Sequence, residues 1–439
     1  MSILSVVKEI QQSVPIPRWK VTAGKVGTGV FVSSTVTDEW TFDDYKKKQT
    51  WGVFGTGEGY VYFELAKRLI DAGHSSTSVF TSGMLVGYDI DIDCIQVLNE
   101  KIFNLFGIDK SKITVYNKDY YKLEETVKFD NFIINSPYLD GTKGNAFVSH
   151  LHTQAALDHW NRKGKGVSIT KSSTFLGQTG GVKSFREQIF NPIDNAVKVR
   201  NLPDDAFPNA IVRAMYVVWD PNSTQDYLEF VDKDGNSIYT MPNDVVDNIF
   251  PSLIIKEVLE KIGTNSNDIS HYTTRRTDNN VECTEEVDTI TLLSKGKATI
   301  TKTNSEYYAF GNYGVVTTFM THGDVKDPYR SHTHNTCMVT PTQSVKSDYV
   351  VIDCGSDEKE AISVLTQIKH PLNAWVHAFT RTSEQGARTP QFRFCCRLSV
   401  EEFYNTWPDG NPSVTDYFDY WNIKTEHQTE ILEWYSKYV

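Results

Sequence analysis

A glycine-rich turn and two acids follow successive strand-like runs in the first third of this 439-residue chain. The glycine turn Gly55-Thr56-Gly57-Glu58-Gly59 ends the run TWGVF, whereas Asp89 ends MLVGYD and Asp119 ends ITVYNKD. Glycines at such a turn let the backbone bend tightly beside a helix N-terminus and approach a ligand closely. An acid at the tip of the second strand can hold both hydroxyls of a ribose. The spacing therefore predicts a nucleoside-binding site. The alternatives are a bare tight turn for the glycines and a helix N-cap for the acid, a role that suits Asp91 or Asp93 better than Asp89.

The fourth run, FIINSPY, predicts an asparagine loop at the C-terminal end of a strand, where open α/β sheets bind their ligands. This stretch resembles the Asn-Pro-Pro-Tyr loop of S-adenosylmethionine-dependent amino-methyltransferases. The resemblance implies that the loop holds an exocyclic amino nitrogen, which is a poor nucleophile because its lone pair is delocalised into the ring. Two acceptors, the Asn135 side-chain oxygen and the Ser136 carbonyl, would favour a pyramidal nitrogen that can react. Pro137 biases Ser136 to an extended conformation, and Tyr138 can stack on an extruded base. A solvent-exposed turn is the alternative.

Strand-like and helix-like segments alternate from about residue 50, as in the helical VYFELAKRLIDAG and CIQVLNEKIFNLFG. This alternation predicts βαβ units on a mostly parallel sheet. The alternation of strand-like and helix-like segments changes around Asp220–Pro221. The later stretch TITLLSKGKATITKT predicts a hairpin in a mixed sheet. Residues 398–439 contain eight Asp or Glu and two Lys and look helical. The length predicts two or three domains.

The composition is that of a globular protein, with 39% hydrophobic and 23% charged residues, which excludes long disorder and coiled coil. The net charge of −11 argues against a protein that coats polyanions everywhere, but it leaves room for one basic groove. No apolar run approaches the roughly 20 residues of a membrane helix. The charges at the start follow a short apolar stretch, which is the wrong order for a signal peptide. The six cysteines show no CxxC pair, so we expect thiols in the cytoplasm.

The stretch VKFDNFIINSPYLDG resembles the Asn-Pro-Pro-Tyr loop of S-adenosylmethionine-dependent amino-methyltransferases. Over roughly residues 50–220 the order of motifs is similar to that of restriction–modification DNA adenine-N6 methyltransferases whose recognition domain comes last. The resemblance implies an α/β fold with a Rossmann-like, S-adenosylmethionine-binding catalytic domain over residues 1–245. It also implies a mixed α/β DNA-recognition domain with an acidic helical tail over residues 246–439. The implied reaction is methyl transfer to the N6 amino group of an adenine flipped from double-stranded DNA.

The resemblance also assigns roles to single residues. Asp89 would hold the cofactor ribose, and Asp119 the amino group of the cofactor's adenine. Phe207, in LPDDAFPNAIVRAMYVVW, would pack on the flipped adenine, with a core phenylalanine as the alternative. The implied catalytic loop is Asn135, Ser136, Pro137 and Tyr138, and the implied cofactor contacts are Gly55, Thr56, Gly57, Gly59, Asp89, Ile90, Asp119 and Tyr120.

Two positions depart from the pattern of the resembled family. Val53 stands where that family usually has an acid, so backbone carbonyls or a residue of the N-terminal segment would hold the methionine ammonium. Ser136 replaces the first proline of the loop, although a backbone carbonyl can still accept there. Together they motivate one rival, a catalytically silent DNA-binding or cofactor-binding relative. Another rival is methylation of RNA or of a protein glutamine, because the same loop can hold any planar amino group.

Arginines near Thr, Gln and Asn in the C-terminal part can read base edges and phosphates, with solvated surface as the alternative. These candidate DNA contacts are Arg275, Arg276, Arg381, Arg388 and Arg393. Phosphate contacts from the catalytic half could come from Arg162, Lys163, Lys165, Lys171 and Lys183. We interpret His322, His332, His334 and Asp324 as polar loop residues and predict no metal site. The expected partners are double-stranded DNA and, in some settings, a separate restriction enzyme, with a monomeric chain and no membrane.

Overall fold

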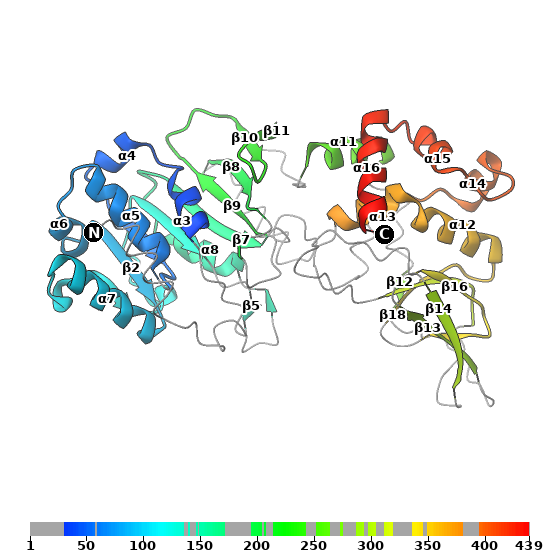
Figure 1. Cartoon of the computed structure of the whole chain (residues 1–439), viewed down its shortest axis with the longest axis horizontal. Coiled ribbons are helices and arrows are strands. Elements are labelled where there is room, and N and C mark those ends of the chain that lie inside the picture. Colours follow the sequence, from blue (N-terminus) through cyan, green and yellow to red (C-terminus); the bar gives the residue numbers. More distant parts are fainter. Residues whose placement is uncertain are drawn as a thin grey trace. The chain divides into compact units, whose positions relative to one another are not determined.

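The chain forms two compact units, Met1–Ile249 and Phe250–Val439 (Figure 1). A computed structural model describes residues 30–57, 59–135, 139–140, 146–147, 149–171, 195–203, 206–207, 214–242, 252–263, 273–274, 287–293, 297–303, 311–318, 336–345, 349–380 and 395–438. The roles that the sequence gives to residues 1–245 and 246–439 stay predictions.

The first unit contains a nine-stranded sheet with the order β11-β10-β8-β9-β7-β4-β1-β2-β3. Its strands are β1 (Trp51–Phe54), β2 (Leu85–Asp89), β3 (Val115–Asn117), β4 (Asn131–Asn135), β7 (Gly166–Lys171), β8 (Ala196–Asn201), β9 (Ala214–Trp219), β10 (Tyr227–Val231) and β11 (Ser237–Pro242). The five strands from β7 to β3 are all parallel. Strand β9 runs antiparallel between β7 and β8, and β10–β11 is an antiparallel hairpin beside β8. The predicted α/β class with a mostly parallel sheet is confirmed.

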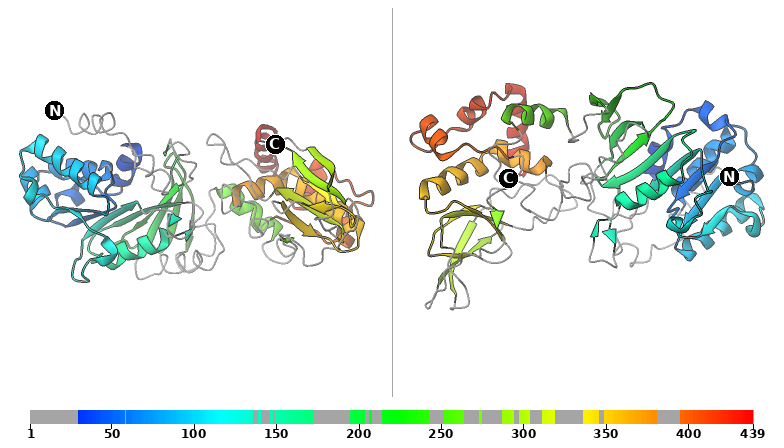
Figure 2. Two further views of the ribbon diagram at one scale, coloured as in Figure 1. Left: turned by 90° about the horizontal axis from the view of Figure 1, so that it is seen from below. Right: turned by 180° about the vertical axis from the view of Figure 1, so that it is seen from behind.

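Helices cover both faces of this sheet (Figure 2). On one face α3 (Val30–Thr37), α5 (Tyr60–Asp71), α6 (Ser76–Thr81) and α7 (Ile92–Phe106) share a core with strand residues such as Val53 and Ile133. On the other face α8 (Ser149–Asp158) packs with Phe54 and Ile134. Neighbouring strand residues thus point to opposite cores, which explains why these strands read as continuous apolar runs rather than as alternating ones.

The strand order places a topological switch point between β1 and β4. The chain runs from β1 outward through β2 to β3, then returns to β4 on the other side of β1. The two connections on either side of this point leave in opposite directions, and open α/β sheets bind their ligands outside the carboxyl ends of the strands at such a point. The sequence-predicted glycine turn follows β1, and Asn135 is the last residue of β4.

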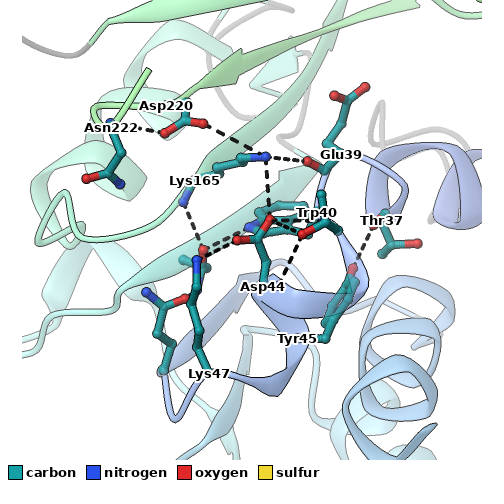
Figure 3. A network of polar contacts seen from close by, with 12 residues as sticks. Thr37, Glu39, Trp40, Asp44, Tyr45, Lys47, Lys165, Asp220 and Asn222 are labelled. Atoms are coloured by element: carbon teal, nitrogen blue, oxygen red, sulfur yellow. Dashed lines mark hydrogen bonds and ion pairs between the residues drawn. The ribbon is translucent and has the colours of Figure 1, made fainter. Parts of the chain in front are cut away.

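At the opposite, amino-terminal edge a polar network joins three segments (Figure 3). The Asn131 side-chain oxygen accepts hydrogen bonds of 2.8 Å from Trp40 Nε1 and from the Lys165 backbone N–H. The Lys165 ammonium lies 3.7 Å from Asp44 Oδ2 and 3.8 Å from Asp220 Oδ2. These contacts fix the N-terminal helices α3 and α4 (Phe42–Lys46) to the starts of β4 and β7.

This network corrects the sequence-based interpretation of the nearby basic residues. Lys165 lies near two carboxylates at the amino-terminal edge, so the structure gives it a role in the fold and does not favour it as a phosphate contact. Arg162 and Lys163 precede β7 and therefore lie at the same amino-terminal edge, opposite the carboxyl edge of the sheet. Lys171 ends β7 and therefore lies at the carboxyl edge. Lys183 lies outside the described residues.

The second unit combines two small sheets with helices. The strands are β12 (Thr273–Thr274), β13 (Val287–Leu293), β14 (Lys297–Thr303), β15 (Gly314–Thr318), β16 (Cys337–Val339), β17 (Ser344–Val345) and β18 (Tyr349–Asp353). The helices are α11 (Leu253–Ile262), α12 (Glu358–Lys369), α13 (Pro371–Thr380), α14 (Val400–Thr406), α15 (Val414–Tyr420) and α16 (Thr425–Tyr438). The predicted hairpin is present as β13–β14 and the predicted helical ending as α14–α16. No helix among the described residues has both the length and the apolar composition that a membrane crossing needs.

His370 lies between α12 and α13 and is 7% exposed. The Leu372 backbone N–H donates to its Nδ1 at 3.1 Å, and its Nε2 lies 3.1 Å from the Val414 carbonyl oxygen. The amide requires a bare Nδ1, and the carbonyl requires a proton on Nε2, so these contacts select the neutral imidazole. Burial lowers the pKa of His370 from 6.5 to about 4, and the Val414 contact opposes this shift.

We expect the second unit to lose stability as the pH falls from 6.5 toward about 4. Because the pKa is lower in the folded state, the unfolded chain binds the proton first. The stabilisation is therefore complete above pH 6.5 and is lost through the folded-state pKa. The shift corresponds to about 3 kcal/mol. Urea unfolding of His370→Asn, which keeps an acceptor near Nδ1 but does not titrate, should show a flatter pH dependence. Equal pH dependence in both chains would contradict this expectation.

Candidate functional site

The glycine turn joins β1 to α5 at the switch point. Gly55, Gly57 and Gly59 have φ values of +73°, +51° and +92°, a region that side chains with a Cβ rarely adopt. The backbone N–H groups of Gly55 and Thr56 donate to the Tyr88 carbonyl at 2.8 and 3.1 Å, which ties the turn to the end of β2. Gly59 begins α5 without a side-chain cap, so no side chain of its own covers this helix N-terminus. The turn is shaped for close approach of a ligand.

Asp89, the last residue of β2, braces this turn. Its Oδ2 accepts from the Gly57 backbone N–H at 2.8 Å, and its Oδ1 accepts from the Asp91 backbone N–H at 2.9 Å. The residue is 5% exposed. A carboxylate oxygen can accept more than one hydrogen bond. Helix α7 is capped by Asp91, which accepts from the Asp93 backbone N–H at 3.1 Å, so Asp89 is not the N-cap.

Asp119 lies after β3 at the same edge, as the N-cap of the short η2 turn (Tyr120–Lys122). Its carboxylate accepts from the Tyr121 backbone N–H at 3.1 Å, and about a third of its side chain is exposed. The Asn117 side chain donates to the Asp89 carbonyl at 3.1 Å, which joins the ends of β2 and β3. Ile90, the residue after Asp89, is 61% exposed. An exposed apolar side chain next to this acid is suited to contact a planar ring.

Tyr120 lies beside Asp119 in the chain, but its side chain is buried beneath the carboxyl edge and is not part of the exposed surface. It is 5% exposed, and its ring centroid lies 5.5 Å from that of Phe54 at the end of β1. Its hydroxyl is hydrogen-bonded to His152 Nδ1 in α8. Burial raises the pKa of Tyr120, and the charges of Tyr121 and Asp89 add to this effect. The sequence indicated Tyr120 but gave no role to His152, because helical periodicity does not reveal a partner 32 residues away.

Asn135 is half-buried and lies beside the glycine turn. A Cβ built on Gly55 would be 3.5 Å from the Asn135 carbonyl oxygen, so the end of β4 and the turn after β1 are in contact distance. Ser136, Pro137 and Tyr138 lie outside the described residues, as does Glu58 of the glycine turn. The structure therefore brings four sequence-predicted features, the turn, Asp89, Asp119 and Asn135, to one edge of the sheet.

Thr56 gives a further indication that the turn binds a ligand. The residue is 6% exposed, and its hydroxyl has no hydrogen-bond partner among the described residues. A buried hydroxyl without a partner is costly, and a ligand with polar atoms would relieve that cost. Its methyl group occupies the space above Gly87, where a Cβ would lie 2.7 Å from Thr56 Cγ2. Together with the glycine turn and Asp89, this residue fits a nucleoside-containing cofactor.

Two residues that the sequence analysis named, Val53 and Phe207, are buried in the hydrophobic core. Val53, where the resembled family has an acid, is 2% exposed and packs in the core under α5. Phe207 is also 2% exposed and lies in the same core. This is the placement expected of a core phenylalanine, and contact of Phe207 with a substrate base stays a prediction.

The predicted DNA contacts fall outside the described residues. These are Arg275, Arg276, Arg381, Arg388 and Arg393. The histidine-rich loop with His322, His332 and His334 lies outside them as well. In the part of the chain that the structure describes, no group of three or more His, Cys, Asp or Glu side chains could hold a metal ion.

No protein-family model and no curated protein matches this chain. Among solved structures, it is similar to the methyltransferase subunit of a type I restriction-modification system from Streptococcus thermophilus, with 16% identity, 48% of each chain covered and a TM-score of 0.38. The type IIG restriction endonuclease BpuSI is similar over 98% of this chain and 63% of its own, with 11% identity and a TM-score of 0.47. The M protein of the type I restriction enzyme EcoKI matches at 11% identity over 42% of this chain and 44% of its own, with a TM-score of 0.34.

The matched region spans less than two thirds of each of these three neighbours. What they bind or modify is a property of those proteins. For this chain, the function has to be inferred from the residues at the carboxyl edge of its own sheet.

Proposed function

We propose that this chain is an S-adenosylmethionine-dependent methyltransferase that modifies the N6 amino group of adenine in double-stranded DNA. The observation that carries the proposal is the shared edge of Gly55, Asp89, Asp119 and Asn135, which follow four adjacent parallel strands. Open α/β sheets bind ligands at this edge, outside the switch point. A nucleoside-binding arrangement beside a side-chain amide supports a reaction between a nucleoside cofactor and an amino group.

The cofactor would be held by residues whose contacts support that role. Asp89 would accept from the two ribose hydroxyls, and Asp119, whose side chain is about a third exposed, would accept from the cofactor's amino group. The turn from Gly55 to Gly59 brings backbone rather than side chains against the ligand. When bound, S-adenosylmethionine supplies an electrophilic methyl group. The methionine ammonium would be held by backbone carbonyls or by the N-terminal segment, because Val53 provides no charge.

Asn135 would orient the target nitrogen. Its side-chain oxygen would accept one N–H bond of the amino group, and the carbonyl of Ser136 would accept the other. These two acceptors would withdraw the lone pair from the ring and direct it toward the methyl donor. Tyr138, and on the family resemblance Phe207, would stack on the extruded base.

Double-stranded DNA is the substrate class that we propose on the resemblance and on the size of the second unit. The arginines at positions 275, 276, 381, 388 and 393 would contact bases and phosphates, and they would offset the net charge of −11 locally. We propose a monomer that acts alone or beside a separate restriction enzyme.

A labelled-methyl assay on several polymers tests the substrate class. The full chain would be incubated with S-adenosylmethionine carrying a radioactive methyl group and, in separate reactions, with long unmethylated duplex DNA, RNA or glutamine-containing protein. We expect label in the duplex DNA. Label in RNA or protein alone would favour the other amino-methyltransferases, and label in none of the three would favour a catalytically silent relative.

A further inference from the structure

A hydrogen bond links the two sides of the candidate site. The η2 turn, whose N-cap is Asp119, follows β3, and helix α8 follows the loop that starts at Asn135. His152, in the first turn of α8, is half-buried, and its Nδ1 is hydrogen-bonded to the Tyr120 hydroxyl of η2. The turn that follows Asp119 and helix α8 are thus connected through two side chains.

Aromatic packing holds these side chains in one geometry. The rings of Tyr120 and Tyr121 are stacked with centroids 5.3 Å apart, and the His152 ring meets Tyr121 edge-on at 4.8 Å. Tyr120 also packs edge-on against Phe54 at 5.5 Å, so it is fixed to the end of β1. Aromatic rings prefer such stacked and edge-on arrangements, so this packing favours the ring orientations in which Tyr120 and His152 form their hydrogen bond.

The hydrogen bond between Tyr120 and His152 forms with either tautomer of a neutral imidazole. The Tyr120 phenol keeps its proton because burial raises its pKa. The phenol donates to Nδ1 when the imidazole proton is on Nε2, and the phenol oxygen accepts from Nδ1–H when the proton is on Nδ1.

Helix α8 is itself anchored to the sheet. The hydroxyl groups of Thr153, the next residue, and Ser168 in β7 are 2.8 Å apart and are both buried. The η2 turn, in contrast, is a single short turn whose Asp119 and Tyr121 carry exposed surface. The hydrogen bond between Tyr120 and His152 therefore connects the short, partly exposed η2 turn to helix α8, which is anchored to the sheet.

We propose that His152 is a positioning residue, which holds Asp119 in place for the cofactor through its hydrogen bond to Tyr120. This inference rests on the proposed function, because it assumes that Asp119 contacts the cofactor. It assigns to His152 no contact with the cofactor or with the reacting atoms.

Calorimetric titration of the full chain with S-adenosylhomocysteine tests the proposal. We expect Tyr120→Phe and His152→Phe each to weaken binding about tenfold, which corresponds to about 1.4 kcal/mol. The double variant should be no weaker than either single one, because both changes remove the same bond. His152→Asn, which places an amide oxygen near the position of Nδ1, should restore most of the affinity.

Tyr121→Phe is the matched control, because it removes a phenolic hydroxyl one residue along the same turn. It should bind S-adenosylhomocysteine like the parent. Thermal unfolding of each variant would show that the titrations compare folded chains. Loss of affinity in Tyr121→Phe equal to that in Tyr120→Phe would overturn the proposal, as would parental affinity in His152→Phe.

Different results would overturn the proposed function and the role of His152. A parent chain that binds no S-adenosylhomocysteine would overturn the proposed function, and this inference with it. A parent that binds, with Tyr120→Phe and His152→Phe binding equally well, would overturn the role of His152 alone.

Discussion

Asn135→Ala should lower the rate of methyl transfer by about 10²–10³, the usual effect of removing one preorganised transition-state acceptor or donor. The side-chain oxygen at the end of β4 is the group that would accept an N–H bond of the target amino group. Cofactor affinity should barely change, because in the proposed function Asn135 contacts the target amino group and not the cofactor. Single-turnover transfer of a labelled methyl group to duplex DNA would measure the rate, and calorimetry the affinity.

The contrasting variant for this prediction is Ser136→Pro, which restores the loop of the resembled family. It should keep or raise the rate, because the second acceptor is a backbone carbonyl that the substitution retains. Transfer at the parental rate by Asn135→Ala would mean that Asn-Ser-Pro-Tyr is an ordinary turn. The methyltransferase proposal would then lose its main support.

Asp89→Asn should weaken cofactor binding by about 1–3 kcal/mol, the cost of leaving buried polar groups without a partner. The carboxylate accepts from the backbone N–H groups of Gly57 and Asp91 with different oxygens. In the asparagine variant an NH₂ group would replace one of these oxygens and would face a backbone N–H, which is also a donor. The substitution would also remove the negative charge that would accept from the ribose hydroxyls. Calorimetry with S-adenosylhomocysteine would measure the loss.

Asp91→Asn is the matched control, because it changes a neighbouring acid whose visible role is the cap of α7. Asparagine is as good an N-cap as aspartate, so both the fold and the cofactor affinity should be preserved. Equal affinities for the parent and a folded Asp89→Asn chain would remove Asp89 from the site.

The carboxyl edge could be predicted because each of its parts has a local signal. Short apolar runs that end in glycine or acid indicate the strands, and parallel strands bring their carboxyl ends together wherever the helices between them are of ordinary length. Strand direction places Asn135 and Gly55 at the same edge, whereas their close approach depends on the pairing of β4 with β1, which no local pattern indicates. The fold class and the edge were therefore accessible without knowledge of any side-chain contact.

Contacts between distant segments could not be predicted in this way. Lys165 looked like a free cation because its partners, Asp44 and Asp220, are far from it in the sequence. Tyr120 was named as a cofactor contact, yet it is buried and holds His152 instead of an open surface. Both depend on which face of a strand or turn meets which helix, and a single sequence carries no signal for that pairing.

Mass spectrometry of nucleosides tests the central claim most directly. Long unmethylated duplex DNA would be incubated with the full chain and S-adenosylmethionine bearing a deuterated methyl group, then digested to nucleosides. The account predicts 2′-deoxyadenosine with the heavy methyl group on N6, in amounts that fall sharply with Asn135→Ala. DNA that contains no heavy methyl group, or contains it on cytosine alone, would contradict the claim.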